Sequence, residues 1–332
     1  MREETPLLTI FTPTYNRADL LFKLYKSLRE QRLYNFEWLI VDDGSTDHTS
    51  LVIEEIRREN KDRFPIRYYQ KENGGKHTAI NVGVREAKGD LFFIVDSDDL
   101  LTPDAVSTIT SDWQEHHSSH ICGLSYLKGY IHNPKASLGH SYSEATSFIG
   151  NYIDVRYNRG VSGEDHAEIF RTELLRDFPF TEYPNERFMS EAIVWIRLGK
   201  RWKMLFVNKI IYLAEYVDGG LTLQGKRLRF QCPLGGIEGS LETMSHEFHL
   251  RTRIKQTLLY IVYSRFAQRS LSEIYFPTSE INQRQIQSIP HFRALLSISL
   301  LPGLALYHYW RRKYHITKSH LHVRYNKPSD NG

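Results

Sequence analysis

Apolar and polar residues follow two alternating periods along the first hundred positions of the chain. Short, almost continuously apolar runs at 7–12, 36–42, 66–70 and 91–95 have the length and composition of buried β-strands. After the first run, apolar residues recur every three or four positions. This spacing predicts an amphipathic helix whose buried face includes Leu20, Leu21, Leu24 and Leu28.

Such a β-α-β-α-β-α-β series predicts an α/β fold of the Rossmann-like type, with a mostly parallel sheet and helices on both faces. The helix after the second strand is expected to open at residues that favour helix starts, and the third helix to begin near Lys76. The expected opening residues of the second helix are Ser45, Thr46 and Asp47.

The second half of the chain is less regular. "AEIFRTELL" predicts a strand that runs into a helix, "ERFMSEAIVWIRLGKRW" an amphipathic helix, and "KMLFVNKIIYLAEY" a pair of short strands. From about Glu247 the pattern is mainly helical. We therefore expect a first domain at 1–235, with two halves at about 1–115 and about 116–235. A helical C-terminal extension at 236–332 follows the glycine-rich "PLGGIEGS".

Four polar clusters follow the four predicted strands: "TPTYNR", "DDGSTD", "KENGGKHTAIN" and "DSDD". The carboxyl ends of parallel strands lie at one edge of a sheet, and ligands of open α/β sheets bind in the crevice beyond that edge. The four clusters are therefore expected to form one site.

The fourth cluster offers two carboxylates, Asp96 and Asp98, on either side of Ser97. Mg²⁺ and Mn²⁺ prefer oxygen ligands and often bridge one or two carboxylates to substrate phosphates. Asp96 and Asp98 are thus candidate ligands of Mn²⁺ or Mg²⁺, which would balance the charge of a diphosphate leaving group. For Asp99, capping of a turn explains the residue at least as well.

The second cluster contains Asp42 and Asp43, and a carboxylate can accept the N–H of a pyrimidine base. Capping of the following helix by Ser45 or Thr46 explains the serine and threonine but not the aspartate pair. The first cluster, which includes Thr12, Pro13, Tyr15 and Asn16, could frame the base from the other side, with Tyr15 as a stacking face. A proline-led loop with Asn16 as a helix cap is the alternative.

The third cluster combines a glycine pair, Lys76 and a helix start. Backbone N–H groups at a helix N-terminus attract anions, and a lysine adds a full charge. This arrangement favours phosphate binding by Lys76, and a loop with a solvated lysine is the alternative.

Taken in order and at this spacing, "TPTYNR", "LIVDDGSTD", "NGGKHTAIN" and "FIVDSDD" resemble the motifs of the inverting family-2 glycosyltransferases, which have the glycosyltransferase-A fold. The resemblance extends from Leu7 to about Asp104 and more weakly to about Thr222. It implies a nucleotide-diphosphate-sugar donor, a hydroxyl acceptor, and inversion at the anomeric carbon. It also implies that 1–235 is the catalytic domain, with a donor-binding half at about 1–115 and an acceptor half at about 116–235. It further implies that Asp42 or Asp43 contacts the base, that Asp96 lies near the ribose, and that Asp98 holds the metal.

The catalytic carboxylate of this family normally belongs to a Glu-Asp pair, and this chain has Ser190-Glu191 instead. Alignment by Trp195 and Leu198 places Glu191 at the catalytic position. If 186–202 is one helix, Glu191 lies on its apolar face, where partial burial would raise its pKa toward that of a general base. A surface glutamate paired with Arg187 is the alternative.

Three further carboxylates are reserve candidates for the base: Glu164, Asp165 and Glu186. The segment 214–222 resembles a loop that closes over the donor, although ordinary turn chemistry at its two glycines explains it equally well.

The chain has 332 residues, 41% of them hydrophobic, and a formal charge of +4, a basic bias too small to indicate a nucleic-acid partner. Its two cysteines are far apart, which is typical of a reducing compartment, and no secretory signal is visible. We therefore expect a cytoplasmic enzyme. The resemblance implies that its acceptor is a saccharide or a lipid-linked saccharide, in the synthesis of a surface glycan.

The apolar segment 294–310 is interrupted by Pro302-Gly303 and is shorter than the ~20 residues of a typical membrane-spanning helix. A basic stretch follows it. Contact of 294–327 with the cytoplasmic face of a membrane, and burial as a helical pair with a solvated tail, are both consistent with this pattern.

Two other functions are compatible with the sequence. A nucleotidyltransferase also binds nucleotide and metal on an α/β sheet, but usually carries a glycine-rich basic loop after its first strand, where this chain has "TPTYNR". A relative that binds a sugar nucleotide without transferring the sugar would account for the altered Ser190-Glu191 pair.

Overall fold

The computed structural model describes residues 5–142, 145–159, 165–214, 228–277 and 279–316. It contains two compact units. Unit 1 comprises residues 1–180 and 194–218, and unit 2 comprises 181–193 and 219–332. The predicted domain boundary at 235 differs from this division and stays a prediction.

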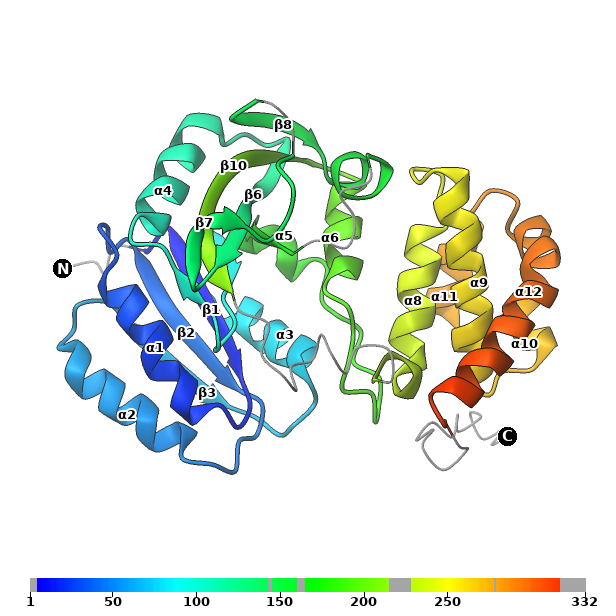
Figure 1. Cartoon of the computed structure of the whole chain (residues 1–332), viewed down its shortest axis with the longest axis horizontal. Coiled ribbons are helices and arrows are strands. Elements are labelled where there is room, and N and C mark those ends of the chain that lie inside the picture. Colours follow the sequence, from blue (N-terminus) through cyan, green and yellow to red (C-terminus); the bar gives the residue numbers. More distant parts are fainter. Residues whose placement is uncertain (1–4, 143–144, 160–164, 215–227, 278, 317–332) are drawn as a thin grey trace. The chain divides into compact units, whose positions relative to one another are not determined.

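Unit 1 is built on a ten-stranded sheet whose first four strands are parallel, in the order β3-β2-β1-β4 (Figure 1). Every residue of the two central strands, β1 and β2, is buried, as the continuous apolar runs predict. The strands of this half are β1 (Leu8–Thr14), β2 (Phe36–Asp42), β3 (Ile66–Gln70) and β4 (Leu91–Ile94).

Helices cover both faces of this parallel half. Helices α1 (Ala18–Arg29) and α2 (Thr49–Asn60) pack on the face that carries Ile10. Neighbouring residues of a strand point to opposite faces, and α3 (Lys76–Glu86) packs on the face of Phe11. There a Cβ at Gly83 would lie 2.3 Å from the Phe11 ring.

The rest of the sheet continues from β4 in the order β9-β6-β10-β5, with β7 on β6 and β8 on β10. β10 pairs parallel with β6 and antiparallel with β5 and β8. β10 is one twelve-residue strand with irregular register, where two short strands were expected. The elements of this half are β5 (Leu100–Leu101), α4 (Ala105–His116), β6 (Ile121–Tyr130), β7 (Asn133–Ser137), β8 (Ser147–Asn151), η1 (Asp154–Asn158), β9 (His166–Arg171), α5 (Thr172–Arg176), α6 (Ala192–Gly199) and β10 (Lys203–Ala214).

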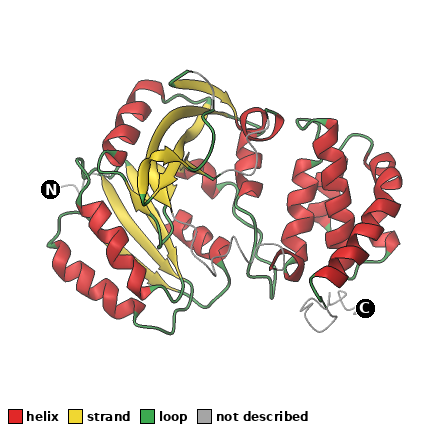
Figure 2. Cartoon of the chain, in the orientation of Figure 1, coloured by secondary structure: helices red, strands yellow, loops and turns green. Residues whose placement is uncertain are grey.

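Unit 2 is helical (Figure 2), and its core is formed mainly by α8, α9 and α12. The glycine-rich stretch near 235 lies inside α8, where a Cβ at Gly236 would lie 2.7 Å from the Tyr263 ring. Gly236 therefore lets α8 and α9 approach closely. The helices are α8 (Pro233–Thr243), α9 (Leu250–Phe266), α10 (Leu271–Tyr275), α11 (Glu280–Gln287) and α12 (Phe292–Lys313).

The predicted α/β fold with a helical C-terminal region is confirmed, but two expected helix starts are wrong. The second helix begins at Thr49 rather than at Ser45–Asp47, because those residues bond to the loop after β1. The helix expected over 186–202 is restricted to α6, which begins at Ala192.

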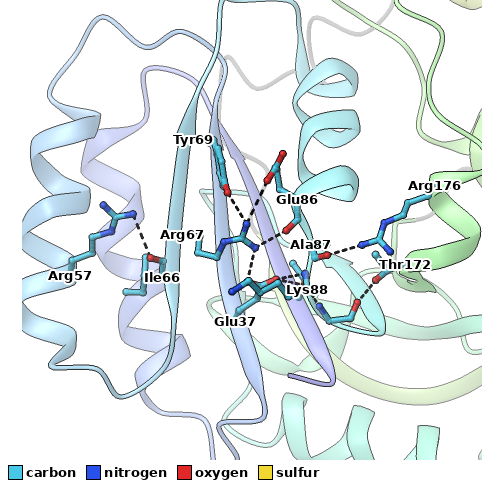
Figure 3. A network of polar contacts seen from close by, with 12 residues as sticks. Glu37, Arg57, Ile66, Arg67, Tyr69, Glu86, Ala87, Lys88, Thr172 and Arg176 are labelled. Atoms are coloured by element: carbon cyan, nitrogen blue, oxygen red, sulfur yellow. Dashed lines mark hydrogen bonds and ion pairs between the residues drawn. The ribbon is translucent and has the colours of Figure 1, made fainter. Parts of the chain in front are cut away.

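The amino edge of the parallel strands is closed by a polar network (Figure 3). The buried Glu37 carboxylate accepts hydrogen bonds from the Thr9 hydroxyl at 2.8 Å and the Lys88 N–H at 2.7 Å, and it pairs with Arg67 at 3.1 Å. Arg67 also donates to the Glu86 carbonyl oxygen. These bonds tie the connection between α3 and β4 to the first three strands, at the edge opposite the four polar clusters.

Candidate functional site

The four polar clusters meet at the carboxyl edge of the parallel strands and are joined to one another by direct contacts. We call them the first to fourth loops, after β1, β2, β3 and β4. The contacts run from the first loop to the second, from the second to the third, from the third to the fourth, and from the fourth back to the first. The result is a closed ring of loops.

The first and second loops are joined through Asn16. Its N–H donates to the Ser45 hydroxyl at 2.8 Å, and its side-chain oxygen accepts the Thr46 N–H at 2.8 Å. Asn16 has a φ of 51°, in the left-handed region that asparagine tolerates better than most residues. It does not cap α1. Instead the Asp47 carboxylate accepts the Ala18 N–H at 3.1 Å from across the two loops.

Asp43 joins the second loop to the third. One carboxylate oxygen accepts the Gly74 N–H at 2.9 Å and the Lys71 ammonium at 2.8 Å, and the other accepts the Gly75 N–H at 2.7 Å. Gly75, which precedes α3, has a φ of 97°. The backbone N–H groups expected to attract a phosphate thus already bind a carboxylate of the chain.

Asp42, the last residue of β2, is also buried. Its carboxylate accepts the Ser45 N–H at 2.7 Å and the Tyr68 hydroxyl at 2.7 Å. Burial, reinforced by the bond to Asp42, raises the pKa of Tyr68. Asp42 therefore braces its own loop and β3.

Two ion pairs complete the ring at the fourth loop. The Lys76 ammonium lies 2.6 Å from the Asp96 carboxylate, and the Arg17 guanidinium lies 3.3 Å from the Asp98 carboxylate. Burial alone would raise the pKa of Asp96, but the ammonium groups of Lys76 and Lys128 outweigh it and hold the pKa below its ordinary value. Asp96 is therefore a carboxylate at neutral pH.

Tyr212 on β10 and Lys128 on β6 belong to the same site and carry no loop motif that the sequence could reveal. The Tyr212 hydroxyl donates to the Asp99 carboxylate at 2.6 Å and accepts the Asp96 N–H at 3.1 Å. The Lys128 ammonium lies 4.1 Å from the centre of the Tyr212 ring. Burial and then the charge of Asp96 raise the pKa of Asp99 to about 7. Tyr212 thus holds both ends of the turn that presents Asp98.

The residues around this turn fit a hard divalent cation. Asp96 and Asp98 form a donor set of oxygens only, and their side chains are 34% and 27% exposed. Mg²⁺ and Mn²⁺ sites commonly use one or two carboxylates and complete their coordination with water and phosphate. Within the described ranges, no group of three or more His, Cys, Asp or Glu side chains could hold a metal. Asp96 and Asp98 are the two carboxylates that would hold the ion.

The remaining predicted nucleotide contacts differ in exposure. Tyr15 presents a side chain that is 46% exposed, and Asn16 is also exposed. Thr12, Pro13 and Ser97 are buried, and the Thr12 hydroxyl accepts the Trp38 indole N–H at 3.0 Å. Among the predicted contacts, Tyr15 and Asn16 are therefore exposed, and the side chains of the two ion pairs are partly exposed.

Glu191 is half-buried in the turn just before α6, so it is not on the continuous helical face that the sequence predicted. It belongs to unit 2. The segment before it is held by Glu186, whose carboxylate accepts the N–H groups of Leu234 and Gly235 at 2.7 and 2.9 Å. Burial raises the pKa of Glu186 to about 7, against the opposing effect of these two donors.

The contacts of Glu186 explain why 186–191 does not continue α6, because the segment follows the start of α8 instead. Of the other reserve carboxylates, Asp165 is exposed and Glu164 lies outside the described residues. So does most of the segment 214–222 that was expected to close over the donor.

Residues 9–177 match the sequence profile of glycosyl transferase family 2. A GalNAc(5)-diNAcBac-PP-undecaprenol beta-1,3-glucosyltransferase of Campylobacter jejuni is 26% identical over 237 residues, which cover 70% of this chain and 72% of that protein. Glycosyltransferase GlyG of Streptococcus pneumoniae is 31% identical over 229 residues, covering 65% of this chain and 72% of that protein.

Among solved structures, residues 1–349 of TarS of S. aureus in complex with UDP-GlcNAc align with a TM-score of 0.61 and 19% identity. The alignment covers 93% of this chain and 91% of that one. At this identity the likeness establishes the fold, which is the one that the sequence motifs predict.

Proposed function

Because this chain belongs to glycosyl transferase family 2, we propose that it transfers a sugar from a UDP-sugar to a hydroxyl group of a saccharide or lipid-linked saccharide, with inversion and with metal assistance. The names of its relatives support this proposal, since one is a glucosyltransferase whose acceptor is linked to undecaprenol. TarS, which has the same fold, was solved with UDP-GlcNAc. The product would be part of a surface glycan made at the cytoplasmic side.

The closed ring of loops is the observation that carries the proposal. It gathers Tyr15, Arg17, Lys76, Asp96 and Asp98 at the sheet edge where α/β proteins bind ligands. An aromatic ring, two cations and two carboxylates match the parts of a nucleotide diphosphate, which are a base, phosphates and a ribose. We assign stacking on the base to Tyr15 and the ribose contact to Asp96.

The remaining predicted contacts surround the base of the same nucleotide. In the proposal, Asp42 or Asp43 accepts the N–H of the base, while the buried Thr12, Pro13 and Ser97 and the exposed Asn16 shape the pocket around it. A carboxylate has about four lone-pair sites. Asp42 uses two of them for Ser45 and Tyr68 and Asp43 uses three within the ring, which favours Asp42 as the base contact.

Lys76 and Arg17 provide the positive charge for the leaving group. Each lies within 3.3 Å of a carboxylate of the fourth loop, so each can also contact a diphosphate bound at these carboxylates. Asp96 and Asp98 would hold Mn²⁺ or Mg²⁺, whose charge, when the ion is bound, offsets that of the diphosphate. Fixed charges aimed at a developing anion lower the barrier to its departure.

Glu191 is the proposed general base. It accepts the proton of the acceptor hydroxyl while that oxygen forms a bond to the anomeric carbon. The bond from the anomeric carbon to the diphosphate oxygen breaks on the opposite face, which inverts the configuration. No covalent intermediate with the enzyme is required.

Release of UDP from a panel of UDP-sugars, with Mn²⁺ and candidate acceptors, tests the proposal. We expect Glu191→Gln to lose turnover by a factor on the order of a hundred or more while it keeps the donor affinity of the parent. Glu182→Gln, an exposed glutamate in the same segment, is the matched control. A parent protein that binds UDP-sugars but transfers none to any acceptor would instead be a binding protein.

A further inference from the structure

Helix α12 carries an exposed apolar stripe. Apart from the adjacent Leu301 and Pro302, its members are separated by steps of three or four residues, so they lie along one side of the helix. The side chain of Ile298 is 72% exposed, that of Leu301 78% and that of Tyr309 55%. The stripe, called the α12 stripe below, consists of the exposed residues Ala294, Ile298, Leu301, Pro302, Ala305 and Tyr309.

The opposite side of α12 packs into the core of unit 2. Leu295, Leu296 and Tyr307 are buried there with residues of α9, and Gly303 lies against Ile261. The exposed leucine and isoleucine are therefore not needed to hold the helix in place. A stripe of fifteen or so residues at 1.5 Å per residue is about 23 Å long, and contiguous exposed apolar surface of this kind usually marks an interaction site.

Both ends of the α12 stripe pair an aromatic ring with a cation. At its start, the Arg293 guanidinium lies 4.8 Å from the centre of the ring of Phe276, which is 58% exposed. At its end, the Lys313 ammonium lies 5.6 Å from the centre of the Tyr309 ring. Arg312 continues the stripe by one more turn. An apolar centre with aromatic and cationic ends is typical of helices that lie in the interface of a bilayer.

Charge determines which partner fits this surface. Residues 292–313 contain four Arg or Lys and no Asp or Glu, and residues 228–316 contain eleven Arg or Lys against five Asp or Glu. Two of those acids, Glu238 and Glu242, are buried. A second copy docked on the same stripe would bring cations together in either orientation, without an acid on α12 to balance them. Anionic lipid headgroups complement the cations, and acyl chains accept the apolar centre.

We propose that the α12 stripe docks this protein onto an anionic membrane surface, with Ile298 and Leu301 entering the apolar boundary and Arg293, Arg312 and Lys313 among the headgroups. No helix in the described part of the chain is long and apolar enough to cross a membrane. The sequence left membrane contact and burial open for this segment. One side of α12 is buried, and the proposal assigns membrane contact to the other.

Co-sedimentation of the full-length protein with lipid vesicles tests the proposal. The vesicles are phosphatidylcholine alone or phosphatidylcholine mixed with phosphatidylglycerol. We expect the parent to bind the mixed vesicles and to release them at high salt. The double variant Ile298→Gln, Leu301→Gln should bind roughly tenfold or more weakly, because two large apolar side chains no longer enter the boundary. Leu51→Gln makes the same leucine-to-glutamine replacement at a 60% exposed site on α2, and this variant should bind as the parent does.

The cations are tested separately. Arg312→Gln with Lys313→Gln should weaken binding to the mixed vesicles and reduce its salt dependence, whereas Lys23→Gln with Lys26→Gln on exposed positions of α1 should leave both unchanged. All these positions are exposed, and circular dichroism checks that each variant is folded.

Three results would overturn the proposal. They are a parent that ignores anionic vesicles, equal binding to neutral vesicles, and a dimer in light scattering that only the stripe variants dissociate. The vesicle assay contains no donor or acceptor, so failure of the docking surface and failure of the proposed sugar transfer are distinguished.

Discussion

Replacement of Asp43 by asparagine tests whether this carboxylate supports the fold or the nucleotide. The buried side chain accepts three hydrogen bonds, from the N–H groups of Gly74 and Gly75 and from the Lys71 ammonium. The amide oxygen of asparagine has two lone pairs, so it can keep the bonds from Gly74 and Lys71, while its NH₂ group takes the place of the oxygen that accepts the Gly75 N–H. Hydrogen bonds to a charged group contribute about 1.5–3 kcal/mol each. Loss of the Gly75 bond should therefore lower the free energy of unfolding by about 1.5–3 kcal/mol.

The change is measured by urea unfolding of the parent and of Asp43→Asn, followed by the fluorescence of the buried Trp38. For a unit of this size we expect a fall in the melting temperature on the order of 10 °C. Asp62→Asn, at an exposed position with φ 59°, removes the same charge and should have little effect. In a double-mutant cycle with Lys71→Met, the two changes should cost less together than the sum of their separate costs.

The reasoning is refuted if Asp43→Asn unfolds at the midpoint of the parent. Should the variant keep that midpoint and lose affinity for uridine nucleotides more than for other nucleotides, Asp43 contacts the base instead of the third loop.

Three further changes follow from buried contacts. The pKa of Glu186 is raised from 4.5 to about 7, so its stabilising effect is full below pH 4.5 and is lost as the pH rises through 7. The unfolding free energy of unit 2 should fall by up to about 3 kcal/mol over that range, and Glu186→Gln should flatten the slope. Gly236→Ala places a methyl group against the Tyr263 ring and should cost about 1–2 kcal/mol net, because overpacking outweighs the gain in helix propensity. Tyr212→Phe removes the hydroxyl that holds Asp99 and should lower kcat/KM for the UDP-sugar about tenfold, the loss of roughly one hydrogen bond.

These three predictions have separate controls. A parent whose stability does not change between pH 5 and 8 would contradict the role of Glu186. Gly239→Ala meets only the side chain of Ile193, at 3.2 Å, and should be tolerated, so an equal loss at both glycines would contradict the packing argument. Unchanged kcat/KM in Tyr212→Phe would mean that the turn carrying Asp98 holds its shape without the hydroxyl.

Local sequence predicted the parallel half of unit 1 well. The second and third strands match the structure residue for residue, and α3 begins at Lys76 as expected. β2 is a nearly continuous apolar run that is buried throughout, whereas β3 is only partly buried. The prediction that the four loops share one edge followed from parallel pairing alone, and the ring of contacts agrees with it.

Prediction failed where side chains bond over long distances in sequence. Ser45 and Thr46 have the composition of a helix start, but they bond to Asn16 in another loop. Glu186 sits in a helix-like pattern, yet its carboxylate is drawn to the first N–H groups of α8. In both cases a tertiary bond replaces the local one, and no pattern of neighbouring residues records it.

Lys128 and Tyr212 were missed for a related reason. They lie on β6 and β10, far along the chain from the loops they support, and a lysine or tyrosine within a strand is ordinary. Only the pairing of β10 with β5 and β6 brings them to Asp96 and Asp99.

The interlocking of the four loops limits how this enzyme can be re-engineered or diversify. A loop exchanged singly for that of a relative would lose its partners on both neighbours, so grafting one segment should impair folding before it alters donor choice. A new donor preference is better sought at Tyr15, the exposed ring that we propose stacks on the base, or by transplanting all four segments together as a single module.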